Sequence, residues 1–163
     1  MFHAGDKVVH PMHGAGIIDG VVTEKIGRDL REYYVFKMPM GGLVLKIPVS
    51  TSDVIGLRDI ISPGAAEELM AGLPGLRVDM TSNWNRRYRE NMDRLKSGDI
   101  RHVAEVIVGL TARDAVRSLS TGERKMLHTA KQIMISELVL STGRSYEEIE
   151  NDINAAVAGE DAG

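Results

Sequence analysis

The sequence predicts an α+β protein in which a small β-barrel precedes an all-α helical domain. Through about residue 57, short runs rich in β-branched residues alternate apolar with polar side chains. From Ser62 onward the apolar residues recur with a helical period instead. A chain of 163 residues has room for two such units. We therefore expect a barrel over residues 1–57, a helical domain over 62–157 and a flexible tail over 158–163.

Five short strands are predicted in the first part of the chain. The second of them contains Gly16 and Gly20, which permit strong bending or a bulge. The strongest strand pattern is the run Glu32–Met38, and Pro39–Gly42 turns it back on itself. Five strands in fewer than sixty residues imply a strongly curved barrel. The five runs are residues 7–10, 15–23, 32–38, 43–48 and 53–57.

The second part of the chain carries a series of helix-capping residues. Ser62 precedes Pro63, the preferred pair at a helix start, and Ser120 and Ser145 each open a capping box. Asn83 and Asp99 are expected to cap helices that begin near residues 84 and 100, and Thr111 to cap a separate short segment ending near Leu119. Tyr88, Met92 and Leu95 are expected to share one face of their helix. The predicted buried positions of the later helices are Val103, Val106, Ile107, Leu110, Leu127, Ala130, Met134 and Leu138.

Positive charge is concentrated in one block of this chain, although its formal net charge is −3. Residues 84–131 hold eleven basic and six acidic side chains, whereas residues 132–163 hold one basic and seven acidic. A polyanion responds to the local field rather than to the total charge, so the basic block favours a nucleic-acid partner.

The only tryptophan begins that basic block, in the run Asn83-Trp84-Asn85-Arg86-Arg87-Tyr88-Arg89. The arginines could hold phosphates through paired donors, and the indole could stack on or wedge beside a base. The alternative is that Trp84 staples a helix start to its neighbours while the arginines form a solvated face. A second basic face, with Arg124, Lys125 and Lys131, is predicted on the longest helix, and it too could be merely solvated.

The sequence does not favour an enzyme, a metal-dependent protein or a membrane-spanning protein. The sequence has no phosphate-binding glycine loop and no apparent nucleophile–base pair, so we expect neither catalysis nor a cofactor. His3, His10 and His13 are expected to be ordinary turn and strand residues rather than metal ligands. No apolar run suits a membrane span, the N-terminus does not read as a signal peptide, and cysteine is absent, which together fit a cytoplasmic protein.

Several dispersed motifs resemble the CarD / CdnL family of bacterial transcription regulators. They are the segments 5–16, Glu32-Tyr33-Tyr34-Val35, 54–58, 83–89 and 119–127. The family resemblance runs from about residue 2 to residue 140. It implies a Tudor/SH3-like barrel that docks on the β subunit of RNA polymerase, and a helical domain that contacts promoter DNA.

The resemblance also implies roles for individual residues. Trp84 is expected to wedge into the minor groove at the upstream edge of the transcription bubble and so stabilise the open complex. Lys46 falls on a basic polymerase-contacting position, and a second such position falls on Glu24, beside Lys25. The implied DNA contacts are Trp84, Arg86, Arg87, Arg89, Arg124, Lys125 and Lys131, and the implied polymerase contacts are Lys25, Arg28 and Lys46.

The resulting hypothesis is a monomeric, non-enzymatic regulator that associates with the nucleoid through RNA polymerase. The competing hypothesis is a protein-interaction adaptor whose helical domain recruits another protein without binding DNA. An exposed strand edge on the barrel could accept a partner strand, or every edge could be closed within the barrel.

Overall fold

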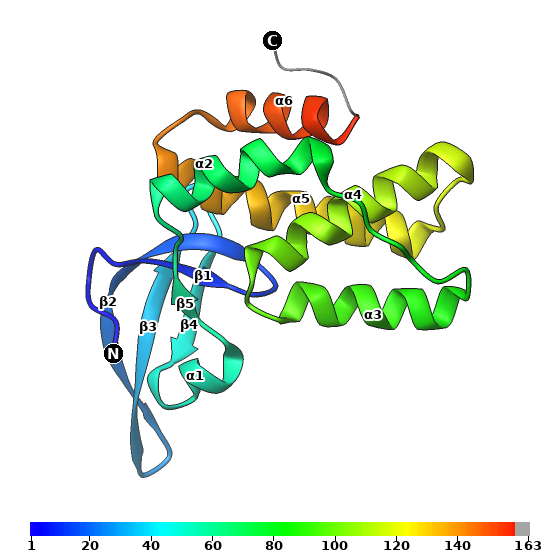
Figure 1. Ribbon diagram of the computed structural model, residues 1–163. Coiled ribbons are helices and arrows are strands. Elements are labelled where there is room, and N and C mark those ends of the chain that lie inside the picture. The colour runs from blue at the N-terminus through cyan, green and yellow to red at the C-terminus, as the bar shows by residue number, and fades with distance from the viewer. Residues whose placement is uncertain (159–163) are drawn as a thin grey trace.

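The computed structural model describes residues 1–158, with a strand-rich part followed by a helical part (Figure 1). The strands form one antiparallel sheet in the order β4-β3-β2-β1-β5. The α+β class is therefore confirmed, with the strands at the N-terminal side. The strands are β1 Lys7–His10, β2 Gly14–Ile26, β3 Asp29–Lys37, β4 Val44–Pro48 and β5 Arg58–Asp59.

A register shift and a close approach of neighbouring strands occur at the two glycines that the sequence singles out. The β2–β3 register shifts between Ile18 and Gly20, which marks a bulge or irregularity at the predicted position. At Gly16 a Cβ would lie 2.7 Å from the ring of Phe36, so only glycine allows β3 to pack this closely. The curved sheet buries its own apolar core, which consists of Val8, Ile18, Tyr34, Phe36, Met38, Ile47 and Leu57.

The strand predicted over residues 53–57 is wrong. Residues Ser52–Ile55 form a short helix, α1, and the edge strand β5 follows it. Gly56 ends the helix in the left-handed conformation, φ 93°, and its N–H donates to the carbonyl of Ser52 at 3.1 Å. Val54 is 89% exposed, whereas Leu57 at the end of the run is 6% exposed and belongs to the barrel core, so the run does not alternate as a strand.

Each of the helices α2 to α6 begins at a predicted cap residue. Ser62, Asn83, Asp99, Ser120 and Ser145 each accept a backbone N–H of the helix that they precede. The elements are α2 Pro63–Gly72, α3 Trp84–Lys96, α4 Ile100–Val116, α5 Thr121–Thr142 and α6 Tyr146–Val157, with short 3₁₀ turns at Val49–Thr51 (η1) and Leu73–Gly75 (η2). Of the tail predicted over residues 158–163, residues 159–163 lie outside the described part of the chain.

Two helical predictions need correction. Thr111 does not start a new helix, because α4 continues through it to Val116 before Arg117 turns to an extended conformation. Leu127 is only partly buried, and the buried surface of α5 is wider than one stripe. The reason is its central position, since α5 contacts α2, α3, α4, α6 and the strand β2 (Figure 1). The other predicted core positions on α4 and α5 are buried.

Candidate nucleic-acid interface

Trp84 is the first residue of α3, and its side chain packs on another aromatic ring of the same helix. Its indole stacks on the ring of Tyr88, one turn further along, with ring centroids 5.1 Å apart and an angle of 20° between the planes. The residue remains 43% exposed. The stack covers one face of the indole and leaves a large apolar surface open to solvent.

The start of α5 supports this tryptophan. Trp84 Nε1 donates to the Oγ of Ser120 at 3.0 Å, and the same Oγ accepts the N–H of Glu123 at 3.2 Å as the helix cap. A Cβ at Gly122 would lie 3.6 Å from the ring of Tyr88 and 3.9 Å from that of Trp84. The N-terminal ends of α3 and α5 therefore meet beside the indole. Their unpaired N–H groups add partial positive charge there.

Arg87 is a structural residue in this fold, which corrects its assignment as a phosphate contact. Its guanidinium donates to Glu123 at 2.7 Å (Oε2) and 3.1 Å (Oε1), and to the carbonyls of Thr81 and Ser82 at 3.1 Å each. Both members of the ion pair have side chains that are only 2% exposed. The hydrogen bond from Arg87 lowers the pKa of Glu123, which keeps that carboxyl ionised. Arg87 therefore ties α3 to α5 below the indole.

The remaining cations assigned to DNA stay at the surface. Arg86, Arg89, Arg124 and Lys125 are exposed, and Lys131 is partly exposed. Arg86 pairs with Glu90 one turn later at 2.9 Å. Within residues 1–158 the others make no ion pair with an acidic side chain. Arg124 and Lys125 lie in the first turns of α5, whose start contacts the indole through Ser120, whereas Lys131 lies about 10 Å further along that helix.

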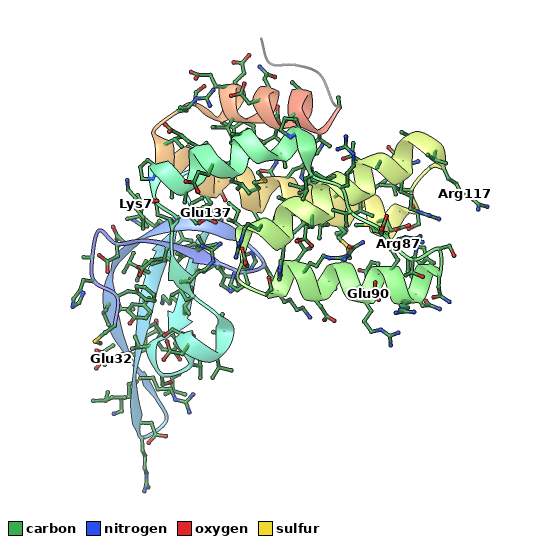
Figure 2. The ribbon with its side chains drawn as sticks, viewed as in Figure 1. Lys7, Glu32, Arg87, Glu90, Arg117 and Glu137 are labelled. Atoms are coloured by element: carbon green, nitrogen blue, oxygen red, sulfur yellow. The ribbon has the colours of Figure 1, made fainter. Side chains whose placement is uncertain are left out.

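Sequence reasoning missed the residues that complete this end of the molecule. Arg113 and Arg117 come from the end of α4, and Figure 2 shows Arg117 at the same end of the helical domain as Arg87. Arg113 also contributes to lowering the pKa of Glu123 through its charge. Both residues belong to the basic block of the sequence, which was the available signal. Their position at this end of the molecule depends on how α3, α4 and α5 pack.

The polymerase-contacting residues implied by the resemblance lie on the barrel. Lys25 and Arg28 are exposed on the β2–β3 hairpin and its turn. Lys46 lies on β4, which is an edge of the sheet, and its ammonium pairs with Glu24 on β2. Glu24, on which the second position implied by the resemblance falls, is thus the direct partner of Lys46.

His10 and His13 lie at the two ends of the turn that follows β1. His10 Nδ1 accepts the N–H of Met12 at 3.1 Å, and the rings of His10 and His13 lie 4.6 Å apart. Burial, together with the charge of His13, lowers the pKa of His10. Among residues 1–158 no group of three potential ligands, including His3, gathers to hold a metal ion.

Comparisons with known proteins cover both units of the chain. Residues 2–61 match the family model described as "CarD-like/TRCF RID domain", and residues 68–154 match the one described as "CarD, C-terminal domain". A protein of Bacillus subtilis (strain 168) named "Putative transcription factor YdeB" is 32% identical over 151 residues, which is 93% of this chain and 99% of that protein. In the described part of the chain no helix is long and apolar enough to span a membrane.

Proposed function

The chain belongs to the CarD family of transcription regulators, and on that premise we propose that it binds RNA polymerase through its barrel and stabilises the promoter open complex through Trp84. It acts without catalysing a reaction and without a cofactor. DNA is bound through the minor groove at the upstream bubble edge, with no sequence readout.

The observation that carries the proposal is the half-exposed indole in a cationic setting. Tyr88 and the Ser120 hydroxyl hold the ring in one orientation, so little ordering entropy is lost when its uncovered side wedges into the minor groove. Arg86, Arg89 and Arg124 are exposed around the starts of the two helices. They are suited to phosphates on either side of an inserted ring.

The barrel supplies the proposed polymerase contact. β4 is an edge strand, with Val44 54% exposed and Lys46 beside it. An edge of this kind can accept a strand of a partner through backbone hydrogen bonds. Lys25 and Arg28 on the neighbouring hairpin add positive charge toward an acidic partner surface.

Tethering explains how weak DNA contacts can be sufficient. A few phosphate contacts give modest, salt-sensitive affinity for free duplex. Binding to polymerase raises the local concentration of the indole at the promoter. A differential affinity of about 1–2 kcal/mol for the open state then lengthens its lifetime by about tenfold.

The test is a measurement of open-complex lifetime with purified polymerase and promoter. We expect the wild type to lengthen the lifetime, Trp84→Ala to lose the effect while still binding polymerase, and Lys46→Glu to lose polymerase binding. Val116→Ala is the control for Trp84, because it removes another exposed apolar side chain, 89% exposed, from the end of α4. Lys37→Glu is the control for Lys46, because it reverses a barrel lysine that pairs with Asp19 instead.

An unchanged lifetime in Trp84→Ala would refute the wedge. The adaptor hypothesis would gain support if that variant recruited the same proteins as the wild type and the polymerase-bound protein showed no salt-sensitive affinity for DNA.

A further inference from the structure

The barrel and the helical domain are joined by a buried polar contact centred on Glu137 of α5. Arg58 on β5 donates to its two carboxylate oxygens at 2.7 and 2.8 Å, and the N–H of Ile61 donates to one of them at 2.9 Å. The side chain of Glu137 is 0% exposed and that of Arg58 is 24% exposed. One carboxylate thus binds the last barrel strand and the segment that leads into the helices.

A second contact lies one residue earlier on α5. Ser136 Oγ accepts the N–H of Ala15 on β2 at 2.9 Å. Gly14 permits this approach, since a Cβ there would lie 2.4 Å from that oxygen. Further hydrogen bonds run from Ser141 to the carbonyl of Ile61 at 2.8 Å and from Lys7 to that of Leu140 at 3.3 Å. Figure 2 shows Lys7 and Glu137 where the sheet meets the helices.

The N-terminal end of α5 lies at the candidate DNA interface, where Ser120 contacts the indole. Glu123 near its start binds Arg87, and Glu137 near its end binds Arg58. The separation of fourteen positions between these two glutamates corresponds to about 21 Å of helix. α5 contains no proline and is packed on several sides, so it behaves as a rigid spacer between the two sites.

We propose that Glu137 is a positioning residue that locks the barrel at one angle to α5 and thereby fixes Trp84 relative to the polymerase-bound barrel. The inference rests on the proposed function, because it concerns how the two binding sites act together. Neither Glu137 nor Arg58 is assigned a contact with DNA or polymerase.

The chemistry of the contact explains why it fixes an angle. Apolar surfaces can slide over one another at little cost, whereas a bidentate arginine–carboxylate pair has a defined plane and direction. A buried carboxylate must also keep its partners, since losing one leaves an uncompensated charge. If the angle were free, the effective concentration of the indole at the bubble edge would fall even though both sites remained intact.

The first measurement is the distance between spin labels on the two units. The chain has no cysteine, so Thr51→Cys on the barrel and Ala115→Cys on α4, both at exposed positions, give one labelled pair. We expect one narrow distance distribution in the otherwise unaltered protein and a broadened one after Glu137→Gln. Ser136→Ala, which weakens the second contact more mildly, should broaden it less.

The second measurement is open-complex lifetime with the same unlabelled variants. For Glu137→Gln we expect the lifetime extension to fall by about tenfold, while affinities for polymerase and for free duplex stay within about twofold of wild type. The control is Glu105→Gln, which removes a partly buried carboxylate paired with Arg94 at 3.4 Å inside the helical domain. It should leave both the distance distribution and the lifetime unchanged.

The outcomes separate this inference from the function on which it rests. A broadened distribution with an unchanged lifetime would overturn it, and so would a reduced lifetime with the wild-type distribution. A distribution and lifetime both equal to wild type would overturn it as well. If the wild type itself fails to lengthen the lifetime, the proposed function is refuted, and the positioning role with it.

Discussion

Arg87→Ala is expected to destabilise the protein far more than its neighbour Arg86→Ala. The substitution removes four hydrogen bonds and leaves Glu123, with a side chain 2% exposed, without its cation. Breaking a buried ion pair by removing one partner costs about 3–5 kcal/mol. Arg86 instead holds an exposed pair with Glu90, of the kind worth about 0.5 kcal/mol or less.

Urea unfolding followed by circular dichroism measures this difference. With a denaturant slope of about 2 kcal/mol per molar, the midpoint should fall by about 2 M for Arg87→Ala and by about 0.3 M or less for Arg86→Ala. Midpoints that agree within about 0.3 M for the two variants would refute the structural role of Arg87. DNA binding by Arg87→Ala should be compared only under conditions in which that variant is folded.

The remaining predictions concern a cap, a glycine and a carboxyl group. Ser120→Ala should lower the free energy of unfolding by about 1 kcal/mol and red-shift the fluorescence emission of the single tryptophan. Its control, Ser145→Ala, should lower the free energy of unfolding by a similar amount and leave the emission unchanged. Equal emission spectra for the two variants would contradict the hydrogen bond to the indole. Gly14→Ala should lower the urea midpoint more than Gly5→Ala, because both have positive φ but only Gly14 faces an atom within 4 Å of its would-be Cβ; equal midpoints would disprove the close approach. Since the pKa of Glu123 is lowered by the hydrogen bond from its arginine partner, the stability it contributes is complete above the ordinary glutamate pKa and is lost as pH falls toward the lower folded value. Unfolding free energies measured below about pH 4 should therefore depend less on pH in Glu123→Gln, and an unchanged dependence would assign the effect to another group.

Local signals explain most of what could be predicted from the sequence. Each cap acts on backbone groups within its own first turn, so Ser62, Asn83 and Ser145 could be read without knowing the fold. The run at residues 53–57 failed because a short apolar segment suits a strand or a helical turn equally. The segment forms a helical turn that ends at Gly56, and its Val54 side chain is exposed to solvent.

The exposed residues of the candidate site could be predicted from the sequence, whereas the buried contacts that hold them in place could not. Trp84 and the exposed cations stand out by composition alone. The burial of Arg87 depends on Glu123, thirty-six residues away, and an arginine in a basic run gives no sign of such a partner. The role of Glu137 depends in the same way on Arg58, which belongs to the other unit. Contacts of this kind follow from tertiary packing rather than from spacing.

The most direct test of the central claim is photo-crosslinking from position 84. Replacing Trp84 with p-benzoyl-phenylalanine in the complex of polymerase and promoter should give crosslinks to nucleotides at the upstream edge of the bubble. The same group at Glu67, exposed on α2, serves as the control. Crosslinks from position 84 only to polymerase, or DNA crosslinks no more frequent than from position 67, would contradict the account.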